Sequence, residues 1–396
     1  MLFFELLQVV LGNRERLCLV PTAAEWTQIY AESERQAVTG ILLYGIDRLP
    51  VEQRPPQALL LQWIGVGQMI EQRNRVMDER CVELLGRIRE VGLRGTILKG
   101  QGIARLYNLD DNLNDNLNGN LNLDKKGSLG KLRQPGDIDV YVSDGREKAI
   151  AYAKSLGQKD IDWDYKHLHL QIWSDTEVEM HYHVEVLLNL WKNRKLQKWF
   201  AKHREAMFCN LNDNHNLDLN SNTNRTNDTN GFVTPTVEFN VFYILLHIYR
   251  HFLYEGVGLR QIIDYYMVLR TVHTFELPVQ EYIEAVREFG MVKFAKGLMW
   301  VIHEALGMPR EWMLWEPDEK EGKYILKQVM AGGNFGHHDK RLSHSGGKLG
   351  AVKAILTHNL HLLTHYPADV IWAPVWIVWH RLWKIKAKAS LSLRKM

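Results

Sequence analysis

The sequence predicts an α+β protein in which a small sheet lies between two helical regions. Residues 137–142 alternate as a short strand does, with Asp137 and Asp139 on one face and three aliphatic side chains on the other. Apolar residues recur at helical spacing from 66 to 91, and a helical pattern returns from Phe232 onward. Helical regions therefore flank the strand-containing centre on both sides in the sequence.

Length and composition indicate a globular protein of two or three domains. The chain has 396 residues, of which 46% are hydrophobic and 24% are charged. Its formal net charge of +3 is spread over the whole chain and provides no argument for nucleic-acid binding. Only residues 380–396 are locally basic, because they carry lysine and arginine without an acid. Nucleic-acid binding through this tryptophan-interspersed C-terminus is a weaker hypothesis, whose signature would be loss of binding as salt rises.

The cysteines and the apolar runs predict a reduced, cytoplasmic protein. Cys18, Cys81 and Cys209 lie far apart and lack the spacing of a zinc site or a disulfide framework. The N-terminus lacks the basic region and long apolar run of a signal peptide. The most apolar run, residues 370–379, contains Pro374 and is too short to span a bilayer. We therefore expect no membrane span.

Residues 1–92 are expected to form an N-terminal helical region. Thr22 is a candidate N-cap, and Gly92 fits the end of a long helix whose apolar stripe is typical of core packing. An α/β core follows at residues 93–208. Its first strand ends at Lys99 and Gly100, where a glycine turn leads into a helix start that could hold a phosphate.

Two segments rich in asparagine interrupt the chain, at residues 110–131 and 209–231. Both are low-complexity sequence. Neither contains enough apolar area to offset the entropy of ordering it. We expect both to lack fixed structure.

Residues 166–185 predict a β-hairpin around a turn at 174–176. Polar and apolar residues alternate on both arms, so that the polar residues gather on one face. So dense a polar face is unusual for a sheet unless it lines a site. It consists of His167, His169 and Gln171 opposite Glu177, Glu179, His181 and His183.

Residues 232–396 predict a C-terminal helical region with two polar pairs at helical spacing. His247 and His251 lie four residues apart on one helix, and Arg260 and Asp264 lie four apart on the next. A zinc pair is the sharper interpretation of the histidines, but no cysteine or third ligand accompanies them at a familiar spacing. Arg260 and Asp264 either face the site or form an intrahelical ion pair worth about 0.3–0.5 kcal/mol.

The carboxylates of Asp137 and Asp139 point to one place. Adjacent carboxylates repel unless a cation lies between them, and hard oxygen ligands suit a Mg²⁺ ion that carries substrate phosphates. The alternative is a pair of solvated residues at the exposed start of an edge strand, which for an isolated Asp-x-Asp is the commoner case. The neighbouring motifs change that balance.

The chain contains, in this order, Leu98-Lys99-Gly100, a helix, Arg133, and then Gly136-Asp137-Ile138-Asp139-Val140. This order resembles that of a family of bacterial uncharacterised nucleotidyltransferases within the polymerase-beta-type nucleotidyltransferase superfamily. The resemblance implies the nucleotidyltransferase fold with a small mixed β-sheet. It also implies Mg²⁺-assisted in-line transfer of a nucleoside monophosphate from an NTP to a hydroxyl acceptor, on a small molecule or a protein. It covers most of the chain and makes residues 110–131 an insertion between the two motifs.

The resemblance further implies three metal-binding carboxylates on adjacent strands, of which Asp137 and Asp139 match the first two. Glu179, in Val-Glu-Met-His, matches the third; its alternative is a surface glutamate paired with a histidine. Glu177 and Glu185 share its strand parity, but Glu177 adjoins the turn and Glu185 lies near the far end. His181 is then an orienting partner or a contact for the leaving phosphate.

The nucleotide-binding candidates are Lys99, Gly100, Arg133 and Arg260. Lys99 and Gly100 stand where the superfamily usually has Gly-Gly or Gly-Ser. Lys99 either contributes charge to the triphosphate or neutralises the carboxylates of a protein that no longer transfers nucleotides. Arg133 is placed for a phosphate or a site carboxylate, against the alternative of an ordinary surface charge. The second functional hypothesis is therefore a catalytically inactive binding or regulatory, antitoxin-like protein; three carboxylates favour the enzyme.

Overall fold

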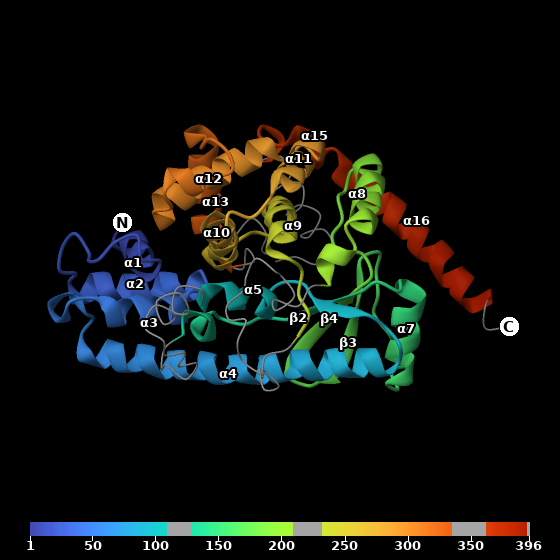
Figure 1. Cartoon of the computed structure of the whole chain (residues 1–396), viewed down its shortest axis with the longest axis horizontal. Coiled ribbons are helices and arrows are strands. Elements are labelled where there is room, and N and C mark those ends of the chain that lie inside the picture. Colours follow the sequence, from blue (N-terminus) through green and yellow to red (C-terminus); the bar gives the residue numbers. More distant parts are fainter. Residues whose placement is uncertain (109–127, 209–231, 335–361, 394–396) are drawn as a thin grey trace, which may run out of the picture.

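The protein contains a four-stranded mixed sheet (Figure 1). The computed structural model describes residues 1–108, 128–208, 232–334 and 362–393. The sheet order is β1-β2-β4-β3, with β2 antiparallel to β1 and parallel to β4, and with β3 and β4 as an antiparallel hairpin. The prediction of an α+β fold with a small mixed sheet is confirmed. The strands are β1 (Gly95–Ile97), β2 (Ile138–Val142), β3 (His167–Trp173) and β4 (Thr176–His181).

The register of the sheet aligns polar side chains from three strands. Asp139 of β2 lies opposite Glu179 of β4, and Glu179 lies opposite His169 of β3. Two residues further along β4, His181 lies opposite His167 of β3. Because side chains alternate between the faces of a strand, all five project from the same face of the sheet.

The hairpin is shorter than the predicted range of residues 166–185. β4 ends at His181, since the N–H groups of Tyr182 and His183 both donate to the carbonyl of Lys166, each at 3.1 Å. The imidazole of His183 bonds to the carbonyl of Tyr165 at 2.7 Å. The prediction that His183 belongs to the polar face of the strand is therefore wrong, because strand alternation applies only where the ladder continues.

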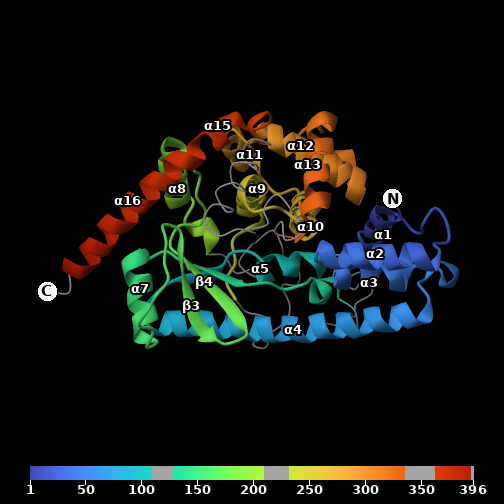
Figure 2. The same cartoon turned by 180° about the vertical axis from the view of Figure 1, so that it is seen from behind.

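The N-terminal helices precede the sheet, as the sequence predicts. Thr22 caps the second helix through a reciprocal pair of hydrogen bonds with Glu25. The last of these N-terminal helices, α4 (Gln57–Glu90), is 34 residues long, or about 50 Å at 1.5 Å per residue. It runs beneath both the other N-terminal helices and the sheet (Figures 1 and 2). The elements are α1 (Leu2–Val10), α2 (Ala23–Arg35), α3 (Thr39–Arg48), a 3-10 turn (Val51–Gln53) and α4 (Gln57–Glu90).

The C-terminal half of α4 covers the apolar face of the sheet. Met77 belongs to one hydrophobic core with strand residues such as Val140, and α7 (Arg146–Ser155) contributes to the same core. Arg73 and Arg80 of α4 also bind the carboxylate of Asp175 in the hairpin turn, at 2.7 and 2.8 Å. Because α4 covers the apolar face of the sheet, only the polar face is open to contact with the helices that follow in the chain.

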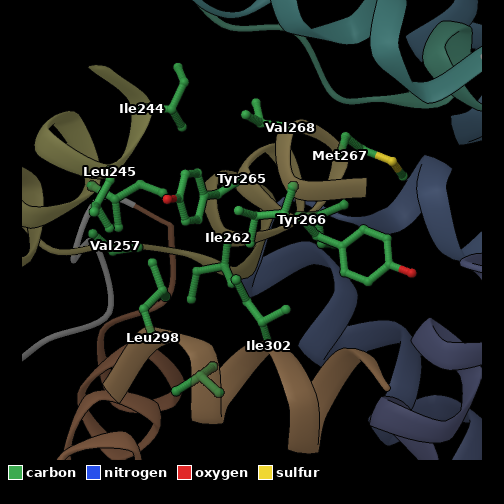
Figure 3. Close-up of a cluster of buried hydrophobic side chains, with 14 of the residues drawn as sticks. Ile244, Leu245, Val257, Ile262, Tyr265, Tyr266, Met267, Val268, Leu298 and Ile302 are labelled. Carbon is green, nitrogen blue, oxygen red and sulfur yellow. The ribbon is translucent and has the colours of Figure 1, made fainter. Parts of the chain in front are cut away.

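The C-terminal helices form a larger core together with α1, α2 and α3. Figure 3 shows side chains of α10, among them Ile262 and Tyr265, between Leu245 of α9 and Leu298 of α12. α10 is buried on nearly all sides, and its buried residues include the polar Arg260 and Asp264. These elements are α8 (Leu190–Lys202), α9 (Val237–Tyr254), α10 (Leu259–Thr274), α11 (Gln280–Glu288), α12 (Val292–Leu306) and α13 (Glu319–Gly332), with 3-10 turns at Glu205–Met207 and Arg310–Trp312.

The first asparagine-rich segment ends in packed structure. Its last residues belong to a 3-10 helix (Leu129–Leu132) in which Leu129 is buried. The N–H of Gly130 donates to the side chain of Asn108 at 2.9 Å, so the described residues on the two sides of 109–127 lie close together. The expectation that the whole range 110–131 lacks structure is therefore wrong at its C-terminal end. Residues 110–127 of that range, and all of 209–231, lie outside the described residues.

The C-terminal helix, α16 (Trp372–Leu393), follows a short helix, α15 (Pro367–Val370), and runs along the outside of the molecule (Figure 2). Its Trp376, Trp379 and Trp383 rings lie 5.5, 5.1 and 5.1 Å from the ring of Tyr165. These rings are engaged in packing, which weakens the idea that they stack on nucleic-acid bases. Across the described ranges, no helix combines the length and the apolar character needed to traverse a bilayer.

Candidate functional site

The three predicted carboxylates come together on the polar face of the sheet. Asp137 directly precedes β2, Asp139 lies within β2, and Glu179 lies opposite Asp139 on the parallel neighbour β4. One oxygen of each carboxylate lies within 4.8 Å of the others. Asp139 is buried, and the other two are partly exposed. Glu177 is instead largely exposed and pairs with His169 at 3.2 Å.

Lys99 points into this carboxylate cluster from the loop after β1. Its Nζ lies 2.9 Å from Asp139 and 3.6 Å from Asp137. The backbone brings it there, because the N–H of Leu98 donates to the carbonyl of Asp139 at 3.0 Å and Gly100 turns the chain with a φ of +57°. The helix that follows, α5 (Gln101–Ala104), is only four residues long.

His181 bridges two of the carboxylates from within the sheet. Its Nε2 lies 2.9 Å from Asp139 and 3.2 Å from Glu179. His167 is adjacent, with its Nδ1 3.5 Å from Glu179. The sequence-based expectation that His181 sits beside the acidic cluster agrees with this geometry.

The positive charges and hydrogen bonds of the cluster favour the ionised forms of Asp139 and Glu179. Burial raises the pKa of Asp139, but the ammonium of Lys99 and the hydrogen bond from His181 outweigh this and lower the pKa to about 2. For Glu179, burial is likewise outweighed by His181 and His167, so its pKa lies well below its usual range. Burial lowers the pKa of His181, yet its bonds to the two carboxylates raise the pKa overall.

Arg133 is a buried partner of a carboxylate. Its Nε and an Nη atom each donate to one oxygen of Asp264, both at 2.7 Å. Tyr107 donates to the same carboxylate at 2.7 Å. The alternative of a surface charge at Arg133 is therefore wrong. This pair ties α10 to the Pro135-Gly136 turn that leads to Asp137.

Arg260, one turn before Asp264 on α10, contacts the same turn. It donates to the carbonyl of Gln134 at 2.8 Å, and a Cβ on Gly136 would lie 3.6 Å from its guanidinium. Burial and the nearby charge of Arg133 lower the pKa of Arg260 to about 10, so it is protonated near neutral pH. Asp264 thus forms its two-bond ion pair with Arg133, on a segment far away in the sequence.

A small cavity of about 30 Å³ lies between these groups, well below the roughly 300–1,000 Å³ of a pocket that encloses a whole ligand. Its walls come from the loop after β1, the turn before β2, α9 and α10. All four predicted nucleotide-binding residues line it. They are Lys99, Gly100, Arg133 and Arg260, joined by Asp137, Asp264 and His247 among others.

Sequence reasoning missed a second buried ionic cluster around Glu185. This carboxylate is fully buried and lies 3.0 Å from Lys166, 3.0 Å from Arg250 and 3.1 Å from His247. Its strand parity had made it a candidate for the site, but it lies beyond the end of β4. His251 pairs instead with Glu255 at 2.8 Å. In the described part of the chain, neither His247 nor His251 belongs to a group of three potential metal ligands.

The fold and the site together define a nucleotidyltransferase-like protein. A comparison with protein families matches residues 22–109 and 129–307 to a family described as uncharacterised nucleotidyltransferase. The chain belongs to this family. The match includes every predicted site residue and omits residues 110–128, in agreement with an insertion between the two motifs. Comparisons with curated proteins and with solved structures gave no match.

Proposed function

We propose that the protein transfers a nucleoside monophosphate from an NTP to a hydroxyl acceptor. The observation that carries the proposal is the register of two parallel strands, which sets Glu179 opposite Asp139 with Asp137 at the entrance of the same strand. Three carboxylates on one sheet face, in a chain of a nucleotidyltransferase family, favour this reaction. The reduced cysteines Cys18 and Cys81 are compatible with the cytoplasm as its location.

The donor set fits Mg²⁺. Asp137, Asp139 and Glu179 offer oxygen atoms within 4.8 Å of one another, and ionised carboxylates are the ligands that this ion prefers. One lysine does not balance three buried or partly buried negative charges, so the cluster retains attraction for a divalent cation. Bound there, Mg²⁺ would neutralise the triphosphate and lower the pKa of the acceptor hydroxyl.

Lys99 and Arg260 are the cations proposed to bind the phosphates. Both line the cavity beside Asp137, and both are protonated near neutral pH. The cavity is far too small to enclose a whole nucleotide. We therefore assign its cations to the phosphates of the substrate alone. Gly100 keeps the loop after β1 in a conformation that side chains rarely adopt, which holds Lys99 at the carboxylates.

The chemistry is an in-line displacement at the α-phosphorus. The acceptor oxygen forms a bond to this phosphorus, the bond to the β-phosphate oxygen breaks, and pyrophosphate leaves while the acceptor loses its proton. The residues of the chain orient the phosphates and hold the negative charge that develops on the leaving group. Arg133 acts indirectly, because its pair with Asp264 positions the turn that carries Asp137.

A specific observation supports a second candidate function. Lys99 already lies 2.9 Å from Asp139, and an internal cation at that place is compatible with a regulatory protein that binds nucleotide or a partner without transfer. The two functions differ in whether NTP is consumed.

Calorimetry with each of the four NTPs, with and without Mg²⁺, tests the shared first step. We expect at least one NTP to bind only in the presence of Mg²⁺, and Asp139→Asn to abolish that binding. Glu177→Gln is the control, since Glu177 is a carboxylate on the neighbouring strand β4 but lies beside the hairpin turn and is largely exposed. Pyrophosphate release then separates the candidates: release supports transfer, and binding without release supports a regulatory protein that binds nucleotide. Binding of no NTP refutes transfer and favours a regulatory protein that acts through a partner.

A further inference from the structure

A second group of potential metal ligands adjoins the three carboxylates and differs from them in chemistry. It consists of His167, Glu179 and His181, and one donor atom of each lies within 4.8 Å of the others. Glu179 belongs to both groups. The second group therefore shares one carboxylate with the first and adds two imidazole nitrogens.

The spacing of the donors matches the edges of a metal coordination shell. The Nε2 of His181 and the Nδ1 of His167 lie 3.2 and 3.5 Å from the Oε2 of Glu179. With metal–ligand bonds of about 2.1 Å, these separations correspond to ligand–metal–ligand angles of about 100° and 113°. Both angles are near tetrahedral, and the donors of His167 and His181 lie within 4.8 Å of each other.

The surroundings of His167 favour a ligand. Its Nδ1 is buried and has no hydrogen-bond partner among the described residues, although it faces Glu179. A buried polar atom without a partner calls for an explanation such as an ion. Rigid strands hold the group, because His167 and His181 are directly paired across the β3–β4 ladder.

We propose that His167, Glu179 and His181 form a second divalent-cation site that binds a metal of the Zn²⁺, Mn²⁺ or Co²⁺ type. Nitrogen donors select these ions over Mg²⁺, which prefers oxygen. Three protein ligands leave coordination positions open to water or a substrate oxygen, as in catalytic rather than structural sites. The two sites form a mixed pair bridged by Glu179. This inference concerns metal binding alone and does not depend on nucleotide transfer.

Cobalt titration of the metal-free protein, without nucleotide, tests the site. Co²⁺ bound by nitrogen in a four- or five-coordinate site absorbs strongly in the visible range, whereas Co²⁺ bound by six oxygens is nearly colourless. We expect the wild type to develop the strong band. His167→Gln should weaken the binding that produces it by more than the roughly 10–100-fold typical of removing an outer hydrogen-bond partner. Circular dichroism verifies that each variant is folded.

Three matched variants localise the signal. Asp137→Asn, which touches only the oxygen site, should keep the band, and Glu179→Gln should lose it. His169→Gln should also keep it, although His169 lies on the same strand and pairs with Glu177. A wild type without the band, an unchanged band in His167→Gln, or loss of the band in His169→Gln alone would overturn the proposal. Loss of the band in folded Asp137→Asn would also overturn it, because a single oxygen-based site would then account for the binding.

Discussion

Replacing Asp264 by asparagine should strongly destabilise the protein, because it leaves the guanidinium of Arg133 buried without a counter-charge. Both side chains are less than a tenth exposed, and the two bonds between them are each 2.7 Å long. Breaking a buried pair of this kind by removing one partner costs about 3–5 kcal/mol. Tyr107 also loses a charged acceptor. Since folded proteins are stable by only about 5–15 kcal/mol, this is a large part of the total.

Urea unfolding followed by tryptophan fluorescence measures the effect. For a slope of about 3–4 kcal/mol/M, expected for a chain somewhat larger than the small proteins usually studied, the midpoint should fall by about 1 M. Glu83→Gln is the matched control, because Glu83 and Arg87 form an exposed pair on α4 worth about 0.3–0.5 kcal/mol. Its midpoint should hardly move.

A double variant separates the loss of a pair from the exposure of an unpaired charge. Arg133→Met with Asp264→Leu removes both charges, and replacing a buried ion pair by apolar residues is often neutral. We expect it to recover at least half of the loss. A cost below about 1 kcal/mol for Asp264→Asn, or a double variant no more stable than the single one, would refute the reasoning that a buried charge is at stake.

Three further predictions address the cation, the third carboxylate and the insertion. Lys99→Met should tighten Mg²⁺ binding and weaken NTP binding, because it removes a positive charge from both; calorimetry showing unchanged Mg²⁺ affinity would contradict this. Glu179→Gln should abolish metal-dependent transfer while Glu177→Gln costs little, and the reverse order in a pyrophosphate-release assay would mean that the wrong strand position was chosen. Replacing residues 109–127 by a short Gly-Ser link should leave the melting temperature within a few degrees, since the flanking segments already meet and closure entropy varies weakly with loop length. Extending the deletion to 109–131 should lower it clearly, because it removes the packed Leu129.

Local patterns in the sequence were sufficient for much of the fold. Alternation located β2 and the hairpin, and helical spacing together with Thr22 and Gly92 located the N-terminal helices. These features depend on neighbours within a few residues, which is why periodicity reports them. Periodicity does not report where a ladder stops, and the prediction of β4 therefore continued past its end at His181.

The composition of the site depended on contacts that no local pattern contains. Parity left Glu177, Glu179 and Glu185 equivalent, and Glu179 was chosen for its central position and its match to the family pattern. The pairing of β4 with β2 supplies the contact itself: Glu179 lies opposite Asp139, while Glu185 is buried among Lys166, Arg250 and His247. The resemblance to the family had indicated Glu179, but it did not show which residue of β2 lies opposite it.

The partner of Arg133 likewise came only from the tertiary structure. Asp264 is 131 residues away in sequence, and its spacing from Arg260 had left two alternatives open, a position facing the site or an intrahelical pair. A buried guanidinium requires a carboxylate, and packing α10 against the turn before β2 is what supplies one. The sequence by itself determined which residues could carry charge to this site. The tertiary structure decided which charges meet, because register and helix packing are set by the burial of apolar faces along the whole chain.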